Sequence, residues 1–278
     1  MLPAILYDYL KQECDALMAA HRTLQEHPSD HDAVHELRTG VKKLRAFFEL
    51  ASQLPDLHFK AGSYLRRLRL LQTIAGFSRD AQLKKKALLK YEKPLQWRFS
   101  YAHLLLQNKQ LDANTLLHTA VKRVKAGFLA TLPDKFHHAT KDIDVKAATQ
   151  QLMAHLFAQY HQLAPPETKA SHTVWHALRK KTKHLYYHFM ILTPMLASYQ
   201  HSARLVKFTK TGGELLGEWH DASELQLFVQ QCIRQLKKEK APPPVNATQL
   251  LNAIRKDTRI HLAQCIAHMR QAPVFIGV

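Results

Sequence analysis

Apolar residues recur every three or four positions along most of this chain, which is the period of a helix that buries one face. In the segment that begins at Val34, one face carries Leu37, Val41, Leu44 and Phe48. The alternating, β-branched patterns of strands are absent, and glycine is scarce, with 8 residues. The pattern therefore predicts an all-α protein.

Proline-containing breaks divide the pattern into helix-length pieces. They lie at His27–Asp30, Leu54–Asp56, Leu132–Asp134, Ala164–Pro166 and Ala241–Pro244. About ten helices are expected from this punctuation. Ser29 or Asp30 can cap the helix that runs to about Gln53, because their side-chain oxygens accept hydrogen bonds from free amide groups of the first turn.

The amphipathic pattern occurs twice in the chain. The segment VHELRTGVKKLRAFFEL, from Val34, is similar to WHALRKKTKHLYYHFMI, from Trp175. At the same offset along the chain, GFSRD from Gly76 falls on GEWHD from Gly217. Because this offset is about half the chain and far longer than a solenoid unit, it indicates a duplicated helical bundle with a pseudo-two-fold axis.

The 278-residue chain is strongly basic, with 40 Lys and Arg residues against 22 Asp and Glu and a formal charge of +18. Such an imbalance is typical of proteins whose partner is nucleic acid, an anionic membrane surface or a phosphate polymer. The N-terminus lacks a basic leader region and no long uncharged apolar stretch occurs, so neither secretion nor a membrane span is predicted. The scattered cysteines, Cys14, Cys232 and Cys265, fit a reducing, cytoplasmic location.

Basic positions recur together with the apolar ones. At the offset that places Trp175 on Val34, the matched residues are His35, Arg38, Lys42, Arg66, Arg69 and Arg79 in the first half and His176, Arg179, Lys183, Lys207, Lys210 and His220 in the second. The first three share one side of their helix with Arg45, within an arc of roughly 80°, whereas Tyr186 takes that position in the second half. A single such stripe fits a solvated helix face equally well. Because these cations recur while flanking residues have diverged, we interpret them as binding residues.

Asp80 and Asp221 also recur, among basic neighbours. They either orient Arg and Lys side chains or form ordinary ion pairs and helix N-caps, and the sequence favours neither. Gly76 and Gly217 are expected to permit close helix packing or a helix end rather than to touch a ligand. The run Lys84–Lys86 has no counterpart in the other half and is interpreted as solvated helix surface.

The dipeptide His220-Asp221 resembles the metal-binding pair of HD-type phosphohydrolases. His220 aligns with Arg79, however, so this position is interpreted as needing a cation or a donor rather than a neutral metal ligand. No additional His and Asp set is placed to complete a metal site, and we expect neither metal nor cofactor.

A phosphate chain suits a row of cations, because it offers roughly one negative charge per unit and many oxygen acceptors. Arg engages adjacent oxygens with its fork, Lys supplies charge, and His donates from either ring nitrogen. Nucleic acid is the alternative partner, although no helix-turn-helix, RNP or zinc-finger signature occurs. A phosphohydrolase would need a metal-holding carboxylate cluster, and acidic residues are sparse beside the basic repeat.

The paired H-x-L-R-x-x-x-K segments, His35–Lys42 and His176–Lys183, are each followed by an Asp at the same spacing, Asp80 and Asp221. This arrangement resembles the CHAD family, whose name refers to conserved histidines in an α-helical domain. The resemblance covers essentially the whole chain. It implies one domain, residues 1–278, of two four-helix-type bundles, about 1–140 and 141–278. It also implies binding of inorganic polyphosphate in a basic central groove or pore, and association with polyphosphate granules.

Carried over to this sequence, the resemblance implies polyphosphate contacts from His35, Arg38, Lys42, Arg45, Arg66, Arg69, Arg79, His176, Arg179, Lys183, Lys207, Lys210 and His220. Tyr186 and His220, which stand where second copies of Arg45 and Arg79 are expected, predict weaker or more pH-dependent binding by the second half. Many relatives look like fusions to a CYTH-type domain with an E-x-E-x-K strand. That motif is absent here, so we expect binding without catalysis.

Overall fold

The computed structural model describes residues 2–167, 169–196 and 202–273, and every regular element in these ranges is an α-helix. The helices are α1 (Leu2–Glu26), α2 (His31–Ala51), α3 (Gly62–Leu95), α4 (Ser100–Arg123), α5 (Phe128–Ala139), α6 (Val145–His161), α7 (His172–Leu196), α8 (Ser202–Lys238) and α9 (Val245–Met269). The prediction of an all-α fold is confirmed. No helix in the described part of the chain combines the length and the apolar character that crossing a membrane requires.

Helix α2 begins where the sequence predicted, because Asp30 caps it. The Oδ1 atom of Asp30 accepts the backbone N–H of Asp32 at 2.9 Å and that of Ala33 at 2.8 Å. These bonds satisfy two of the donors that a first turn leaves free. The helix ends at Ala51, slightly before the predicted Gln53.

The helix break predicted at Leu132–Asp134 is wrong, because Pro133 lies inside α5. The break in this region lies instead between α4 and α5, where α4 ends with Val124 as its C-cap. A proline within a helix removes one backbone donor from the hydrogen-bond ladder. Burial of Leu129, Leu132 and Phe136 in the core stabilises this short helix in spite of that loss. The other four predicted breaks fall between helices.

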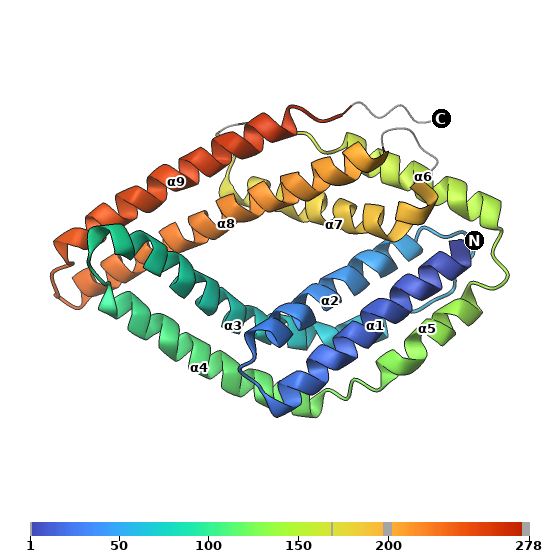
Figure 1. Cartoon of the computed structure of the whole chain (residues 1–278), viewed down its shortest axis with the longest axis horizontal. Coiled ribbons are helices and arrows are strands. Elements are labelled where there is room, and N and C mark those ends of the chain that lie inside the picture. The colour runs from blue at the N-terminus through green and yellow to red at the C-terminus, as the bar shows by residue number, and fades with distance from the viewer. Residues whose placement is uncertain (1, 168, 197–201, 274–278) are drawn as a thin grey trace.

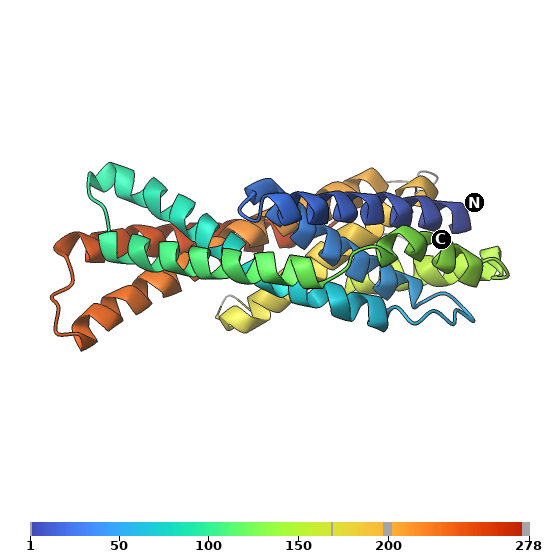
Figure 2. The ribbon, with the colours of Figure 1, turned by 90° about the horizontal axis from the view of Figure 1, so that it is seen from below.

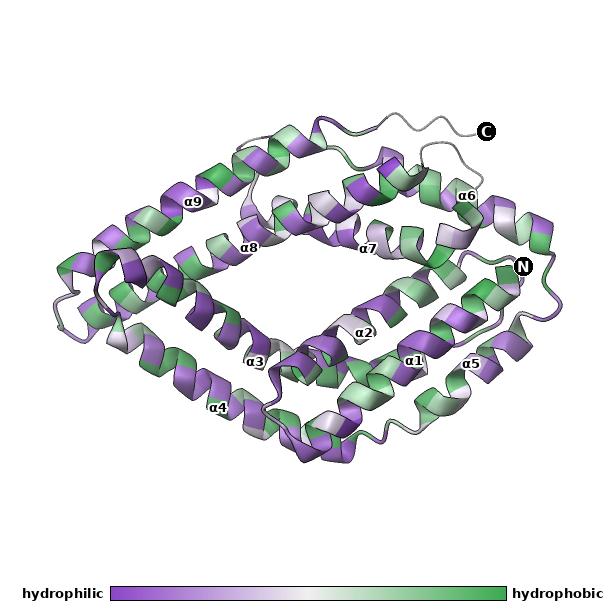
Figure 3. Ribbon diagram, viewed as in Figure 1, coloured by the Kyte–Doolittle hydropathy of each residue, from purple (hydrophilic) through white to green (hydrophobic). Residues whose placement is uncertain are grey.

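The helices follow the sides of an elongated lozenge (Figure 1). The α3–α4 and α8–α9 pairs form its narrow end, and α1, α2, α5, α6 and α7 fill the other end. Turned by 90°, the molecule is a flattened body in which α3 and α8 diverge at the narrow end (Figure 2). Apolar and polar residues are mixed along each helix (Figure 3), as expected for helices that bury one face and expose another.

Two hydrophobic cores hold the helices together. The larger core joins both halves of the sequence, with Phe47 of α2 and Phe189 of α7 among its fully buried side chains. The smaller core joins the far ends of four helices and includes Leu88 of α3, Leu225 of α8 and Ile254 of α9. Within the described residues, each core therefore takes its apolar surface from both halves of the chain.

The order of helices recurs along the chain. Helices α2 and α7 begin at His31 and His172, and the long helices α3 and α8 begin at Gly62 and Ser202, so nearly the same length of chain separates the members of each pair. The equivalent helices also touch, since α2 contacts α7 and α3 contacts α8. The pseudo-two-fold axis and the division into two halves stay predictions. The contacts of α2 with α7 and of α3 with α8 bring the repeated residues of these four helices close together.

Candidate functional site

Repeated basic residues of the two halves converge where α2, α3, α7 and α8 meet. Burial, and then the charges of Arg38, Lys183 and Arg179, lower the pKa of Lys42 from its ordinary 10.5 to about 8. Burial also lowers the pKa of Arg38, and the charges of Arg79 and Arg179 act in the same direction. Such mutual effects require the charges to lie close together. We call these five residues, Arg38, Lys42, Arg79, Arg179 and Lys183, the cationic cluster.

Two side chains of the cationic cluster pack against glycines of the neighbouring helices, where a larger residue would crowd them. Arg38 crosses Gly76 of α3 so closely that a Cβ atom there would lie 2.7 Å from Nη1 of Arg38. Lys183 crosses Gly213 of α8, where a Cβ atom would lie 3.4 Å from Cγ of the lysine. The expectation of close packing is confirmed for Gly76. Neither alternative fits Gly217, which lies inside α8 and whose added Cβ would meet no described atom within 4 Å beyond its own stretch of helix; Gly213 takes this role instead.

Equivalent arginines of the two halves each keep a buried donor without a partner. Among the atoms that the structure describes, Nη1 of Arg38 and Nε of Arg179 are buried and form no hydrogen bond. An unpaired buried donor costs about 1–3 kcal/mol, so native proteins rarely retain one without a reason. Both donors belong to guanidinium groups, which pair well with carboxylate or phosphate oxygens. The arrangement can therefore bind an anion.

The two repeated aspartates lie among these cations. Both are far from a helix start, since α3 begins at Gly62 and α8 at Ser202, so the N-cap interpretation is wrong. Asp80 forms a 2.8 Å ion pair with Lys84, one turn further along α3. Burial lowers the pKa of Arg179, and the carboxylate of Asp221 opposes this shift. Asp221 thus helps to keep a cluster residue charged.

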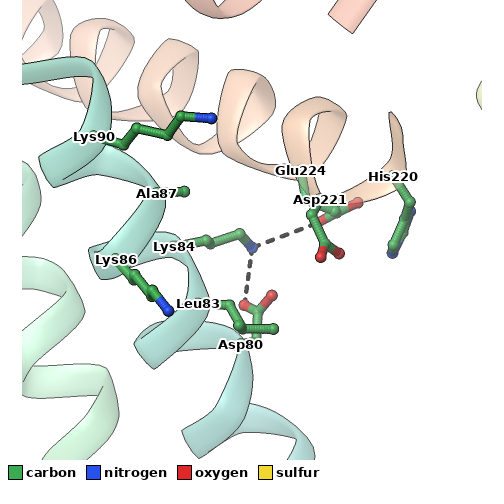
Figure 4. Close-up of a pocket in the computed structure, with 9 residues that line it drawn as sticks. All are labelled: Asp80, Leu83, Lys84, Lys86, Ala87, Lys90, His220, Asp221 and Glu224. Carbon is green, nitrogen blue, oxygen red and sulfur yellow. Dashed lines mark hydrogen bonds and ion pairs between the residues drawn. The ribbon is translucent and has the colours of Figure 1, made fainter. Parts of the chain in front are cut away.

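A pocket of about 430 Å³ opens between α3 and α8 beside the aspartates (Figure 4). Lys84 reaches into it, with Nζ 2.8 Å from Oδ2 of Asp80 and 3.4 Å from Oε2 of Glu224. Only 14% of this lysine side chain is exposed, so its interpretation as solvated surface is wrong. Sequence reasoning also missed Glu224. The available signal was spacing, since Lys84 follows Asp80 and Glu224 follows His220 by four residues, which places each pair on one helix face.

The repeated histidines lie beside a residue of the following helix: His35 lies beside Arg79 of α3, and His176 lies beside His220 of α8. In the first half, burial and then the charge of Arg79 lower the pKa of His35. In the second half, the rings of His176 and His220 lie 4.7 Å apart, centre to centre. Burial, and then the charge of Arg179, lower the pKa of His220 to about 3. With this pKa His220 is neutral at pH 7, so of the two roles expected at this position, a cation or a donor, only that of a donor is left.

One predicted contact lies in a different place. Arg45 lines a separate pocket of about 340 Å³, together with Glu49, Lys180, Lys181 and His184. Its position on α2 carries it to this second pocket, where His184 Nδ1 lies 2.8 Å from Oε2 of Glu49. Arg45 is therefore not part of the cationic cluster.

Four further predicted contacts are exposed. Arg66 and Arg69 of α3 share a helix face with Gly76, which faces α2, because residues three and four apart lie on one side. Lys207 and Lys210 hold the matching positions on α8. Arg66 is ten residues from Gly76, which corresponds to about 15 Å along the axis. These four residues continue the row of basic side chains along α3 and α8, toward the N-terminal ends of both helices and away from the cationic cluster.

Comparisons with known proteins identify the fold. A family model described as CHAD domain matches residues 9–230. No curated protein matches the sequence. Among solved structures, the chain is similar to PptA from Streptomyces chartreusis, with a TM-score of 0.65 and 16% identity over 97% of this chain and 98% of that one. It is also similar to the crystal structure of the CHAD domain from the plant Ricinus communis, with a TM-score of 0.69 and 17% identity over 99% and 94%.

Proposed function

Because the chain belongs to the CHAD domain family, we propose that it binds inorganic polyphosphate through the cationic cluster. The observation that supports this most directly is the pair of unpartnered guanidinium nitrogens, on Arg38 and Arg179, among the described residues. They come from equivalent positions of the two halves and lie within reach of each other's charge. A chain of phosphates offers acceptor oxygens at short, regular intervals, so one molecule can engage both arginines.

The charge balance of the site favours a polyanion. The five residues of the cationic cluster and Lys84 supply six positive charges, while Asp80, Asp221 and Glu224 supply three negative ones. The remaining repulsion is part of the reason that the pKa of Lys42 is lowered. A bound phosphate chain would compensate this excess and would release its own counterions, which is the main driving term for binding to polyanions.

The exposed basic residues offer a continuation of the site. A polymer held at the cationic cluster can extend over Arg66 and Arg69 of α3 and over Lys207 and Lys210 of α8. Contacts there are solvated, so each contributes less than a contact in the cluster. Arg45 lies outside this path. We further propose that the polymer is bound without being cleaved and that binding directs the protein to polyphosphate granules.

A competition titration tests the proposal. Long-chain polyphosphate, single-stranded RNA and duplex DNA would be compared at matched phosphate concentration and about physiological salt, with the polymer analysed on a gel afterwards. We expect a strong preference for polyphosphate and recovery of intact polymer. Equal competition by RNA or DNA would instead identify a general polyanion or nucleic-acid binder, and shortened polymer would identify an enzyme.

Affinity for polyphosphate is expected to fall as the pH rises through about 8. Below this pH, Lys42 is protonated in the free protein, since its pKa is about 8, and it attracts phosphate with its full charge. Above this pH, Lys42 is mostly neutral in the free protein and must take up a proton before it attracts phosphate. The free-energy cost of that protonation weakens the apparent affinity. Between pH 7 and 9.5 the dissociation constant should rise roughly threefold or more at constant ionic strength.

The Lys42→Arg variant is the matched control, because arginine stays charged throughout this range. Its affinity should change much less between pH 7 and 9.5, as measured by fluorescence polarisation with labelled polyphosphate. Identical pH profiles for the wild type and the variant would show that Lys42 is not the group that titrates.

A further inference from the structure

We propose that His172, His220 and Glu224 form a binding site for a divalent transition-metal ion of the zinc type. One ligand atom from each residue lies within 4.8 Å of the other two. His172 is the first residue of α7, whereas His220 and Glu224 lie one turn apart on α8. Figure 4 shows the side chains of His220 and Glu224 on neighbouring turns of that helix. No spacing in the sequence indicates this set, because His172 comes from a different helix.

Each of the two histidines has a ring nitrogen that can serve as a metal ligand. Within the described residues, Nε2 of His172 and Nδ1 of His220 are buried and have no hydrogen-bond partner. The two rings lie 5.7 Å apart, centre to centre, and Trp219 lies 5.0 Å from His172 and shields one side. Imidazole nitrogens are good ligands for zinc, copper and nickel. An ion bound through these two nitrogens would give each of them a partner.

The ligand set indicates which ions fit. Two imidazoles and one carboxylate suit Zn²⁺, whose bonds to nitrogen and oxygen measure about 2.0–2.2 Å, whereas Mg²⁺ and Ca²⁺ prefer oxygen ligands alone. Tetrahedral coordination at that bond length sets ligand atoms about 3.4 Å apart, so small side-chain rotations would close the site around an ion. Three protein ligands leave a fourth position for water or another oxygen.

Lys84 opposes metal binding at this place. Its Nζ atom lies 3.4 Å from Oε2 of Glu224 and competes with a metal ion for the carboxylate. The lysine also pairs with Asp80, at 2.8 Å, and can keep that partner when an ion binds. We therefore expect Lys84 to weaken the site without blocking it.

Titration of Zn²⁺ into the metal-free full chain, in the absence of polyphosphate, tests the proposal by calorimetry. One ion per chain should bind, and His172→Ala, His220→Ala and Glu224→Gln should each lower the affinity by at least about tenfold. The matched control is His261→Ala, because His261 also faces a glutamate, with Nδ1 3.6 Å from Oε2 of Glu218, in a pair outside the proposed set. This control should leave the affinity unchanged, and circular dichroism would verify the fold of each variant.

A second measurement keeps the test decisive. Co²⁺ in the same site should give the intense visible absorption of a four-coordinate ion, and this signal should be lost in His220→Ala. Lys84→Met should raise the Zn²⁺ affinity severalfold, because it removes the charge that competes for Glu224. Wild-type protein that binds no Zn²⁺, or a His172→Ala variant with unchanged affinity, would overturn the proposal. Since no polyphosphate is present, either result leaves the proposed function untouched.

Discussion

Replacing Arg38 and Arg179 together with alanine is expected to weaken polyphosphate binding by at least about 100-fold while the protein stays helical. Each guanidinium can make a charge-assisted hydrogen bond to phosphate, with a contribution of about 1.5–3 kcal/mol. Both groups already hold an unpartnered buried nitrogen in the described structure, so little reorganisation precedes the contact. Their removal also takes away two charges that burial disfavours, which offsets part of the packing lost on truncation, and circular dichroism would verify that the protein stays helical.

Direct titration at several salt concentrations measures this effect. For single-stranded polyanions, the log-log slope of affinity against salt changes by about 0.7 per neutralised phosphate, so the double variant should have a slope smaller by about 1.4. The matched control replaces Arg98 and Arg123, which are exposed and lie outside the cationic cluster, and removes the same net charge. Unchanged affinity in a folded Arg38→Ala, Arg179→Ala protein would remove these positions from the site.

Gly76→Ala is expected to weaken polyphosphate binding about tenfold, although alanine is the better helix former. The new Cβ atom would lie 2.7 Å from Nη1 of Arg38, so the guanidinium must move. Because the arginine side chain is flexible, the displacement should affect its position more than the stability of the protein. One misplaced charge-assisted contact is enough for the predicted loss.

Gly217→Ala is the internal control for that result. It holds the equivalent position on α8, yet no described atom beyond its own stretch of helix would lie within 4 Å of an added Cβ. We expect unchanged affinity and a gain in stability of up to about 1 kcal/mol, measured by urea unfolding. Equal effects of the two substitutions on binding would mean that contact with α3 does not set the position of Arg38.

The helices themselves could be predicted with good accuracy. The cap at Asp30 and four of the five proline-containing breaks follow from local rules, since a side-chain oxygen or a missing backbone donor acts within one turn. Pro133 is the exception. Its neighbours Leu129 and Phe136 are buried in the core, and this packing outweighs the local preference for a break.

The site could be predicted only in part. The internal repeat drew attention to Arg38, Lys42, Arg179 and Lys183 because equivalent positions keep equivalent chemistry. It could not identify Lys84, which belongs to the first half only and was therefore interpreted as surface. Its burial depends on the approach of α8, whose Glu224 lies in the second half of the chain.

Properties of short segments determine what can be read directly from the residues: the all-α character, the start of α2 at its Asp30 cap, and the recurrence of the same basic residue types at matched positions. Packing alone establishes that the cations of both halves meet, that Gly76 but not Gly217 makes room for an arginine, and that His172 joins His220 and Glu224. The physical reason is that both hydrophobic cores take helices from both halves. Distances between residues so far apart follow from how those helices cross, which periodicity, capping and charge do not encode.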